Sequence, residues 1–401
     1  MIKPFMDIYT LLEVINIALL FMLALSVIYL FLFAVASKFY RNVVHKKDGP
    51  TNRFLILFPA YKEDTVILEA VNSFLEQDYD KEKYQVIVIA DAMEEHTNNQ
   101  LGKLPIRLLK ANYTNSSKAK ALQMAIASTK EEMYDMVIIM DADNITEVDF
   151  LSRVNDAYNA GEHFIQTHRK AKNMNTDIAV LDAVSEEINN SIFRKGHTVL
   201  GLSSAFIGSG MGLSYSWFRD HVNCLHTAGE DKELEILLLK ERIHISYLQE
   251  ITVYDEKVQK KEGLEKQRLR WLSAQFTSFK KLYPYFCKGV ATGNIDLCNK
   301  VIQWMMLPRI ILLLSVLLFT LLNIVLNTAI VGAWWVLSIG LFLSIIIAIP
   351  TAMLTKKTFK TIIHLPLLSL MMARNLLKLN RVGTKFIHTS HGCDKEKEKR
   401  K

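Results

Sequence analysis

Two long stretches without any charged residue constrain the fold of this 401-residue chain more than any other feature. The first covers the 24 residues from Val14 to Ser37, and the second covers the 46 residues from Ile310 to Thr355. A helix needs about 20 apolar residues to cross a bilayer, so the first stretch fits one crossing and the second fits two, joined by a turn near residues 327–332. The sequence therefore predicts an N-terminal anchor and linker in residues 1–50, a soluble domain in residues 51–290, and a C-terminal membrane region in residues 291–401.

Basic residues beside these stretches predict the orientation of the chain. They are Lys38, Arg41, Lys46, Lys47, Lys356, Lys357 and Lys360. Positively charged flanks stay in the cytoplasm, so we expect a multi-pass protein of the inner (plasma) membrane, in contact with membrane lipids, with a cytoplasmic central domain and an outer N-terminus. The formal net charge of +7 is concentrated at these flanks, and it therefore does not indicate a nucleic-acid partner.

Two further signals bear on processing and on redox chemistry. Ala34-Val35-Ala36 resembles a signal-peptidase site, but the apolar stretch is longer than the core of a usual signal peptide, so we expect an uncleaved anchor. The four cysteines show no paired spacing, which predicts reduced thiols and no zinc site.

The region after the second stretch predicts helices that lie on the membrane surface. Residues 361–379 contain a short apolar core interrupted by His364 and Pro366, which favours an interface helix over a fourth crossing. The amphipathic segment 296–306 predicts either a similar helix or the lead-in to the next crossing. The two histidines of KFIHTSH (385–391) are not expected to bind a metal.

The first half of the central domain alternates between strand and helix patterns. Continuous apolar runs predict strands over 53–58, 84–90 and 136–140, and the segments 66–75 and 116–129 have the apolar spacing and composition of helices. This alternation predicts an α/β fold with a parallel sheet covered by helices, in which ligands bind at the carboxyl ends of the strands. The polar residues expected at those ends are Tyr61, Asp91, Asp141 and Asp143.

Asp141 and Asp143 are separated only by Ala142, and two carboxylates this close are most easily explained by a cation between or beside them. A polar turn that closes the strand is the alternative. Asp91 adds a third carboxylate and Lys118 adds a positive charge for a phosphate, although they could also be a strand-end cap and a solvated helix residue. Together these residues predict a pocket for a nucleoside diphosphate and a divalent ion.

Three later segments also carry candidate site residues. The segment 206–214, FIGSGMGLS, has three glycines within five residues, which allows a ligand to approach the backbone but also fits a flexible loop. Glu230 and Asp231 precede a helical pattern and could simply complement its dipole. The segment 267–271, QRLRW, places a guanidinium beside an indole, which suits a phosphate next to a ring; an ordinary solvated helix face is the alternative.

The order of these segments resembles the membrane-bound inverting glycosyltransferases of family 2, the group that contains cellulose, chitin, hyaluronan and poly-N-acetylglucosamine synthases. The resemblance covers residues 50–290 and rests on FPAYKED, VIVIAD, SKAKAL, DAD, FIGSG, GED and QRLRW. It implies a GT-A fold, a Rossmann-like nucleotide-diphospho-sugar transferase domain, here with flanking transmembrane helices. It also implies transfer of a sugar from a UDP-sugar donor with formation of a β-glycosidic bond.

The resemblance assigns a role to each matching residue. The donor nucleotide and diphosphate would be held by Tyr61, Glu63, Asp91, Lys118, Asp141, Gln267 and Arg270. Asp141 and Asp143 would bind Mg²⁺ or Mn²⁺, and Asp231 would be the catalytic base that deprotonates the acceptor hydroxyl. The acceptor would be bound by Phe206, Gly208, Ser209, Gly210, Glu230 and Trp271.

The sequence departs from the pattern of that family at a few positions and leaves the acceptor open. AMEEHT follows Asp91 where glycine or serine and another acid are usual, SSKAKAL lacks glycines before Lys118, and Ser209 and Gly229 replace common threonines. QRLRW favours extension of a saccharide chain, and with three crossings such an enzyme would need a second copy of itself or a membrane partner subunit. The alternatives are transfer of one sugar to a membrane lipid such as a ceramide or polyprenyl phosphate, and a membrane protein that binds sugar nucleotides without turnover.

Overall fold

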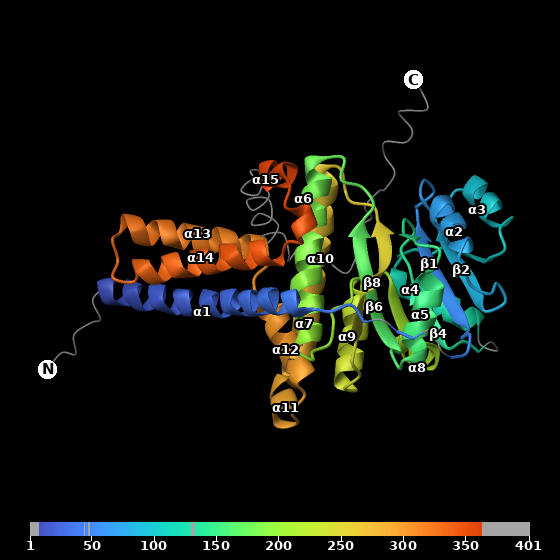
Figure 1. The fold of residues 1–401 in the computed structure, drawn as a ribbon, viewed down its shortest axis with the longest axis horizontal. Coiled ribbons are helices and arrows are strands. Elements are labelled where there is room, and N and C mark those ends of the chain that lie inside the picture. The colour runs from blue at the N-terminus through green and yellow to red at the C-terminus, as the bar shows by residue number, and fades with distance from the viewer. Residues whose placement is uncertain (1–7, 44, 47–48, 130–132, 363–401) are drawn as a thin grey trace, which may run out of the picture.

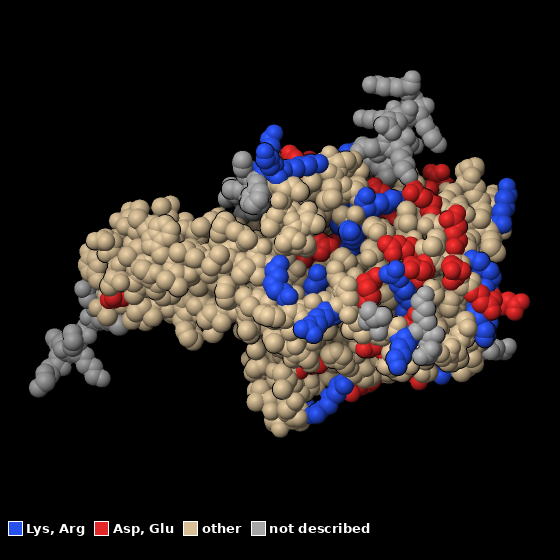
Figure 2. Space-filling model, in the orientation of Figure 1, with Lys and Arg blue, Asp and Glu red and all other residues tan. Residues whose placement is uncertain are grey.

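The computed structural model describes residues 8–43, 45–46, 49–129 and 133–362. Three apolar helices, α1 (Ile8–Ala36), α13 (Arg309–Val325) and α14 (Val331–Ala348), lie side by side and project from the rest of the molecule (Figure 1). The surface of this lobe carries almost no charged side chains on the face seen in Figure 2. The break between α13 and α14 falls at residues 326–330, close to the predicted turn.

Two of these helices are long and apolar enough to cross a membrane, and a third crossing is formed if a bent pair counts as one span. α1 with the turn that follows it and α14 pass alone, whereas α13 passes only together with α12 (Ile295–Met305), from which it is bent by 59°. α12 coincides with the amphipathic segment predicted at 296–306. The last described helix is α15 (Lys356–Ile362), so most of the predicted interface helix at 361–379 and the segment 385–391 lie outside the described residues.

An eight-stranded sheet forms the centre of the other lobe, with the strand order β3-β2-β1-β4-β7-β6-β8-β5. The parallel half contains β1 (Phe54–Tyr61), β2 (Tyr84–Asp91), β3 (Arg107–Ala111) and β4 (Met136–Ile139). In the other half, β7 (Met211–Ser214) runs antiparallel to both of its neighbours, β6 (Phe164–Ala171) pairs in parallel with β8 (Ser246–Asp255), and β5 (Ile145–Thr146) pairs with β8 at the edge. The predicted α/β fold with parallel strands is confirmed.

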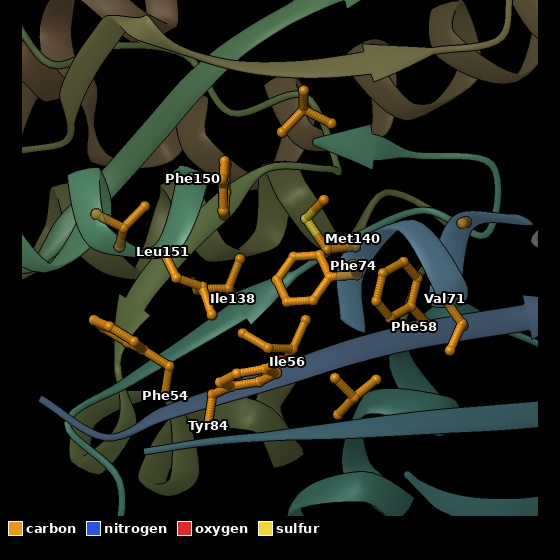
Figure 3. Packing of buried hydrophobic residues seen from close by; sticks show 14 of the residues in the cluster. Phe54, Ile56, Phe58, Val71, Phe74, Tyr84, Ile138, Met140, Phe150 and Leu151 are labelled. Carbon is orange, nitrogen blue, oxygen red and sulfur yellow. The ribbon is translucent and has the colours of Figure 1, made fainter. Parts of the chain in front are cut away.

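Alternate residues of β1 point to opposite faces of the sheet and belong to two separate hydrophobic clusters. Phe54, Ile56 and Phe58 pack with Phe74 and Phe150 on the face covered by α2 (Ile67–Leu75), α3 (Glu95–Leu101) and α5 (Phe150–Asn159), as Figure 3 shows. Leu55 and Leu57 pack on the other face, covered by α4 (Lys118–Ser128), α8 (Tyr215–His221) and α9 (Glu230–Lys240). Because both faces are buried, the strand is apolar throughout, which is why it could be recognised in the sequence.

Two helices stand between the sheet and the apolar lobe in Figure 1: α6 (Asp177–Asn190) and α10 (Lys261–Leu282). The chain after α6 continues through a π-helical turn (Ser191–Gly196) into α7 (His197–Val199), and this turn packs against α1. The short helices between the remaining elements are Ser37–Phe39, Val222–Cys224, Tyr283–Tyr285, α11 (Phe286–Ala291) and Thr351–Met353. A third hydrophobic cluster joins α1, α6, α13 and α14, so the apolar lobe and the sheet domain share packed side chains.

Candidate active site

A deep pocket opens at the carboxyl ends of the parallel strands, where the sequence predicted one. Its lining includes twelve of the predicted site residues: Tyr61, Glu63, Asp91, Lys118, Asp141, Asp143, Gly208, Glu230, Asp231, Gln267, Arg270 and Trp271. They come from the ends of β1 and β2, the turn after β4, the first turns of α4 and α9, the middle of α10 and one loop. The fold thus brings together residues that are more than 200 positions apart in the sequence.

The turns at the ends of β1 and β2 are unusual in their backbone. Tyr61 and Asp91 are paired at the last position of the two strands, and each is followed by a residue with positive φ, Lys62 at 56° and Ala92 at 52°. Non-glycine residues rarely adopt this conformation, and strained backbone of this kind tends to cluster at functional sites. Oδ1 of Asp91 is buried without a hydrogen-bond partner, although Asp91 lines the pocket. This oxygen could accept a hydrogen bond from a nucleobase or from a ribose hydroxyl.

Lys118 connects three parts of the pocket. Its Nζ donates hydrogen bonds to Oδ1 of Asp141 at 2.5 Å and to the carbonyl oxygen of Gly208 at 2.6 Å, and it lies 3.7 Å from Oε1 of Glu230. Burial alone would favour the neutral forms, but the attraction between Asp141 and Lys118 prevails and lowers the pKa of Asp141 while it raises that of Lys118. Both groups are therefore charged at neutral pH.

The turn after β4 holds Asp141 and Asp143 in a fixed arrangement. The backbone N–H of Asp141 donates to Oδ1 of Asn144, whose side-chain nitrogen donates to Oδ1 of Asp143, and Oδ2 of Asp143 accepts the backbone N–H of Glu256. Throughout the described ranges, no group of three or more His, Cys, Asp or Glu side chains could hold a metal ion. Two carboxylates in one pocket nevertheless fit Mg²⁺ or Mn²⁺, because Mg²⁺ is usually bound by one or two carboxylates together with substrate phosphate oxygens.

Glu230 and Asp231 form the first turn of α9, and they differ in their surroundings. Glu230 is buried, and its pKa is raised to about 7. Burial is the main cause and the negative charge of Asp231 adds to it, whereas the positive charge of Lys118 acts in the opposite direction. Asp231 lines the pocket, accepts the backbone N–H of Lys232 at 2.8 Å, and has Nζ of Lys232 3.6 Å from its carboxylate. The adjacent Gly229 allows α10 to pass close by, since a Cβ there would lie 3.1 Å from Cβ of Ala274.

α10 presents Gln267, Arg270 and Trp271 to the pocket from successive turns, as residues three and four positions apart share one helix face. Oε1 of Gln267 is buried without a hydrogen-bond partner. Arg270 is close enough to Asp141 to contribute to the lowering of its pKa. Arg268, between them in the sequence, lines a neighbouring cavity instead; it donates to Asp182 at 2.6 Å and lies 4.7 Å from the ring centroid of Trp271.

The predicted acceptor segment 206–210 is only partly at the pocket. Gly208 lines it, whereas Phe206 lines a second cavity nearby. Ser209 and Gly210 line neither cavity, because the chain turns inward here to begin β7: the carbonyl oxygen of Ser209 accepts from Gln166, and that of Gly210 accepts the backbone N–H of Thr167.

A buried charged network beside the pocket was not predicted from the sequence. Nε of Arg169 in β6 donates to Glu186 of α6 at 2.5 Å and its guanidinium lies 4.0 Å from Asp141, while Lys257 bonds both Glu186 and Asp255. Against the effect of burial, these contacts lower the pKa of Glu186 and raise those of Arg169 and Lys257, so these three groups are charged at neutral pH. Arg169, Asp255 and Lys257 line the pocket, and together with Glu186 the network balances two cations against two carboxylates.

Comparison with known proteins agrees with this geometry. The family model described as glycosyltransferase like family 2 matches residues 50–274. Among solved structures, a mannosyltransferase from Pyrobaculum calidifontis in complex with GDP-Man and Mn²⁺ matches with a TM-score of 0.58 and 16% identity, over 91% of this chain and 99% of that chain. This likeness confirms the predicted GT-A fold. TarS from S. aureus in complex with UDP matches at a TM-score of 0.38 and 14% identity, over 57% of this chain and 65% of that chain. No curated protein sequence matches.

Proposed function

The chain belongs to the glycosyltransferase-like family 2, and we propose that it transfers a sugar from a UDP-sugar to an acceptor hydroxyl at the membrane by a single inverting displacement. It is a glycosyltransferase that uses a nucleotide sugar, and the finer assignments rest on the pocket. The observation that carries the proposal is the convergence of Lys118 and Arg270, two neighbouring carboxylates and Asp231, at the start of α9, in one pocket. The mannosyltransferase of similar fold was solved with GDP-Man, so the nucleobase of the donor is best tested with both UDP- and GDP-sugars.

The donor would lie along the carboxyl ends of the strands. Tyr61 and Asp91 would contact the nucleobase and the ribose, and the unpaired Oδ1 of Asp91 would accept a hydrogen bond from the nucleotide. Glu63 also belongs to the pocket lining. Lys118, Arg270 and Gln267 would hold the diphosphate. The cations oppose the negative charge that develops on the leaving diphosphate, and preorganised charges of this kind supply a large part of catalysis.

Asp141 and Asp143 would hold Mg²⁺ or Mn²⁺ against the diphosphate. A bound divalent ion neutralises charge on the leaving group and orients it. The existing bond between Asp141 and Lys118 keeps the carboxylate ionised, which a metal ligand requires.

Asp231 would remove the proton from the acceptor hydroxyl. In a single displacement the hydroxyl oxygen bonds to the anomeric carbon from the face opposite the diphosphate, the bond between that carbon and the diphosphate oxygen breaks, and a β-linkage results from an α-linked donor. One base is sufficient for this reaction. Glu230 and Trp271 would contact the acceptor, with the indole packing on a sugar ring.

Replacement of the proposed base tests this assignment. We expect Asp231→Asn to abolish sugar transfer, by a factor of about 100 or more, while UDP binding measured by calorimetry stays within twofold of the wild-type value. The matched control is Asp220→Asn, which alters an exposed carboxylate on α8 and should leave both quantities unchanged. Unchanged transfer by Asp231→Asn would contradict the assignment of the base.

Two further measurements separate the alternatives. Release of UDP by purified protein with donor, acceptor and metal is expected of an enzyme, whereas a protein that only binds sugar nucleotides would release none. Product analysis separates the acceptors: chain extension, which QRLRW favours, gives long polymer, and a lipid acceptor gives one sugar on extractable lipid.

A further inference from the structure

A second cavity lies between the active-site pocket and the apolar helices. Six residues line both cavities: Arg169, Asp182, Ile207, Asp231, Lys232 and Trp271. The remaining lining of the second cavity comes from α6, the π-helical turn, residues 205–206, Glu235 of α9, α10, α12, the connection 306–308, the start of α13 and one residue of α1. The proposed base and the indole of α10 therefore stand at the boundary between a pocket for the donor and a space that leads to the membrane helices.

The charges in the second cavity do not balance. Five cationic and four acidic side chains line it. Each acid is paired with a cation other than Arg194 or Arg309, in the pairs Glu186 with Arg169, Asp182 with Arg268, Asp231 with Lys232, and Glu235 with Lys300. Arg194 and Arg309 thus have no carboxylate within 4.0 Å among the residues that the structure describes.

The two unpaired guanidinium groups are held in place by neutral groups. Arg194 is 3% exposed and donates to the carbonyl oxygen of Ala205 and to Oδ1 of Asn190, and Arg309 donates to the carbonyl oxygen of Ser185. Each guanidinium has five N–H donors, so both retain hydrogen-bonding capacity. A buried cation without a counter-charge is costly, and burial accordingly lowers the pKa of Arg194. An anion that entered the cavity would offset this cost.

The far side of the same cavity is apolar. Leu30 of α1 and Leu312 of α13 are buried in its wall, and Leu307, Pro308 and Ile310 line it around Arg309 where the chain bends between α12 and α13. A ligand that fills the cavity would meet Asp231 at one end, guanidinium groups within it, and the side chains of membrane helices at the other end. A neutral saccharide would satisfy only the first of these contacts.

We infer that the second cavity binds the acceptor, and that the acceptor is an amphiphile whose phosphate is held by Arg194 and Arg309, with its apolar chain along α1 and α13. The inference rests on the proposed function, which it deepens by naming the acceptor class. A hydroxyl on the headgroup beyond the phosphate would reach Asp231, give its proton to that carboxylate, and form the new bond to the anomeric carbon as the nucleoside diphosphate leaves.

Binding of three simple probes to the full chain in a nonionic detergent tests the inference. Octyl phosphate carries both features of the ligand, octanol lacks the phosphate, and inorganic phosphate lacks the chain. We expect octyl phosphate to bind at least tenfold more tightly than either of the others by calorimetric titration. Equal binding of octyl phosphate and octanol would overturn the anion site, and equal binding of octyl phosphate and inorganic phosphate would overturn the lipid.

Variants assign the binding to the two arginines. Arg309→Gln should weaken the binding of octyl phosphate about tenfold, and Arg194→Gln should do the same if it folds. Arg219→Gln, on α8 and paired with Asp220, is the matched control and should have no effect. Unchanged affinity in Arg309→Gln would overturn the inference.

UDP binding is measured on the same proteins. Retention of UDP binding with loss of octyl phosphate binding is the expected result for Arg309→Gln, since Arg309 does not line the donor pocket. Absence of UDP binding in the wild-type protein would instead contradict the proposed function.

Discussion

At the scale of single residues, Asp143 offers the most direct test of the proposed metal site. Asp141 is bonded to Lys118, so its replacement would also release that lysine, whereas Asp143 is held by Asn144 and the backbone of Glu256. We expect Asp143→Ala to reduce metal-dependent transfer about 100-fold or more, because the leaving diphosphate would lose its metal ion. The measurement is initial rate against Mg²⁺ or Mn²⁺ concentration, with Asp220→Ala as the control.

The outcome for Asp143→Ala also bears on the residues around it. If the variant kept its metal-dependent rate, the metal would have to bind elsewhere, and the pocket would have been assigned to the wrong carboxylates. A rate that recovers at high metal concentration would support the assignment, since it would show weakened metal binding rather than a misfolded protein.

The position of a residue in a strand or helix decides which site residues could be predicted from the sequence. Asp91 and Asp141 follow apolar strands, and the parallel sheet places both at one edge, so local pattern was sufficient to group them. Arg169 of β6, Glu186 of α6 and Lys257 of the loop after β8 meet only in the folded protein. The only local signal is charge inside a regular element, such as Arg169 in the strand FIQTHRKA, and nothing in the sequence pairs one residue with another.

At the scale of elements, Gly196 determines how closely the π-helical turn packs on α1. A Cβ at this position would lie less than 3.0 Å from the carbonyl oxygen of Phe33, and a backbone atom cannot move aside easily. We expect Gly196→Ala to lower the free energy of unfolding by about 2 kcal/mol through overpacking. Thermal unfolding in detergent measures the change, and Gly332→Ala on α14, where a Cβ would meet nothing within 4 Å, is the control. Equal melting temperatures for the two variants would show that α1 is not held against this turn.

Asp296 attaches α12 to the sheet domain in a way that depends on pH. Its carboxylate accepts hydrogen bonds from the backbone N–H of Ser203 at 2.7 Å and from its hydroxyl at 2.8 Å, with Nδ1 of His244 at 3.9 Å. Burial opposes ionisation, but these contacts prevail and lower the pKa of Asp296 below its ordinary value of 3.8. Because the pKa of Asp296 is lower in the folded than in the unfolded protein, the ionised carboxylate stabilises the fold at pH values above its pKa in the unfolded protein. This stabilisation is lost as the pH falls through the pKa of Asp296 in the folded protein.

Replacement of Asp296 should therefore have an effect that changes with pH. We expect Asp296→Ala to lower the free energy of unfolding by about 2 kcal/mol at pH 7, with a smaller difference from wild type below pH 4. Melting temperatures at a series of pH values measure it. A difference that stayed constant down to pH 3 would show that the ionised form of Asp296 contributes nothing.

Element prediction succeeded where the pattern was long and failed where pairing is non-local. The strands β1, β2 and β4 are apolar runs bounded by polar turns, and the helix predicted at 116–129 contains α4. By contrast, β7 has four residues and is buried between two strands that are distant in the sequence, so its pairing is fixed by tertiary contacts. The 59° bend between α12 and α13 was also not predicted, although Pro308 at the bend is a local signal for it.

At the scale of the whole molecule, the distribution of charge separates two lobes (Figure 2). The sheet domain carries the charged residues, and the helical lobe exposes large apolar side chains such as Phe21, Leu321 and Phe342. Exposed apolar surface of this extent marks contact with a membrane or another protein. Because the active-site pocket and the second cavity adjoin the base of this lobe, an acceptor held in the bilayer could reach Asp231 without leaving it.

The predicted orientation of the lobe gives the last prediction. The basic flanks predict a cytoplasmic central domain, so we expect the loop at residues 326–330 between α13 and α14 on the opposite side of the membrane from Cys224, which is exposed on the sheet domain. Two single-cysteine proteins test this: one with only Ala329→Cys after serine replaces the four native cysteines, and one that keeps only Cys224. We expect a membrane-impermeant maleimide to label Ala329→Cys in intact cells, and to label Cys224 only after permeabilisation. The reverse pattern would place the pocket outside the cell, away from cytoplasmic sugar nucleotides, while labelling of both in intact cells would show that residues 309–348 do not cross the membrane.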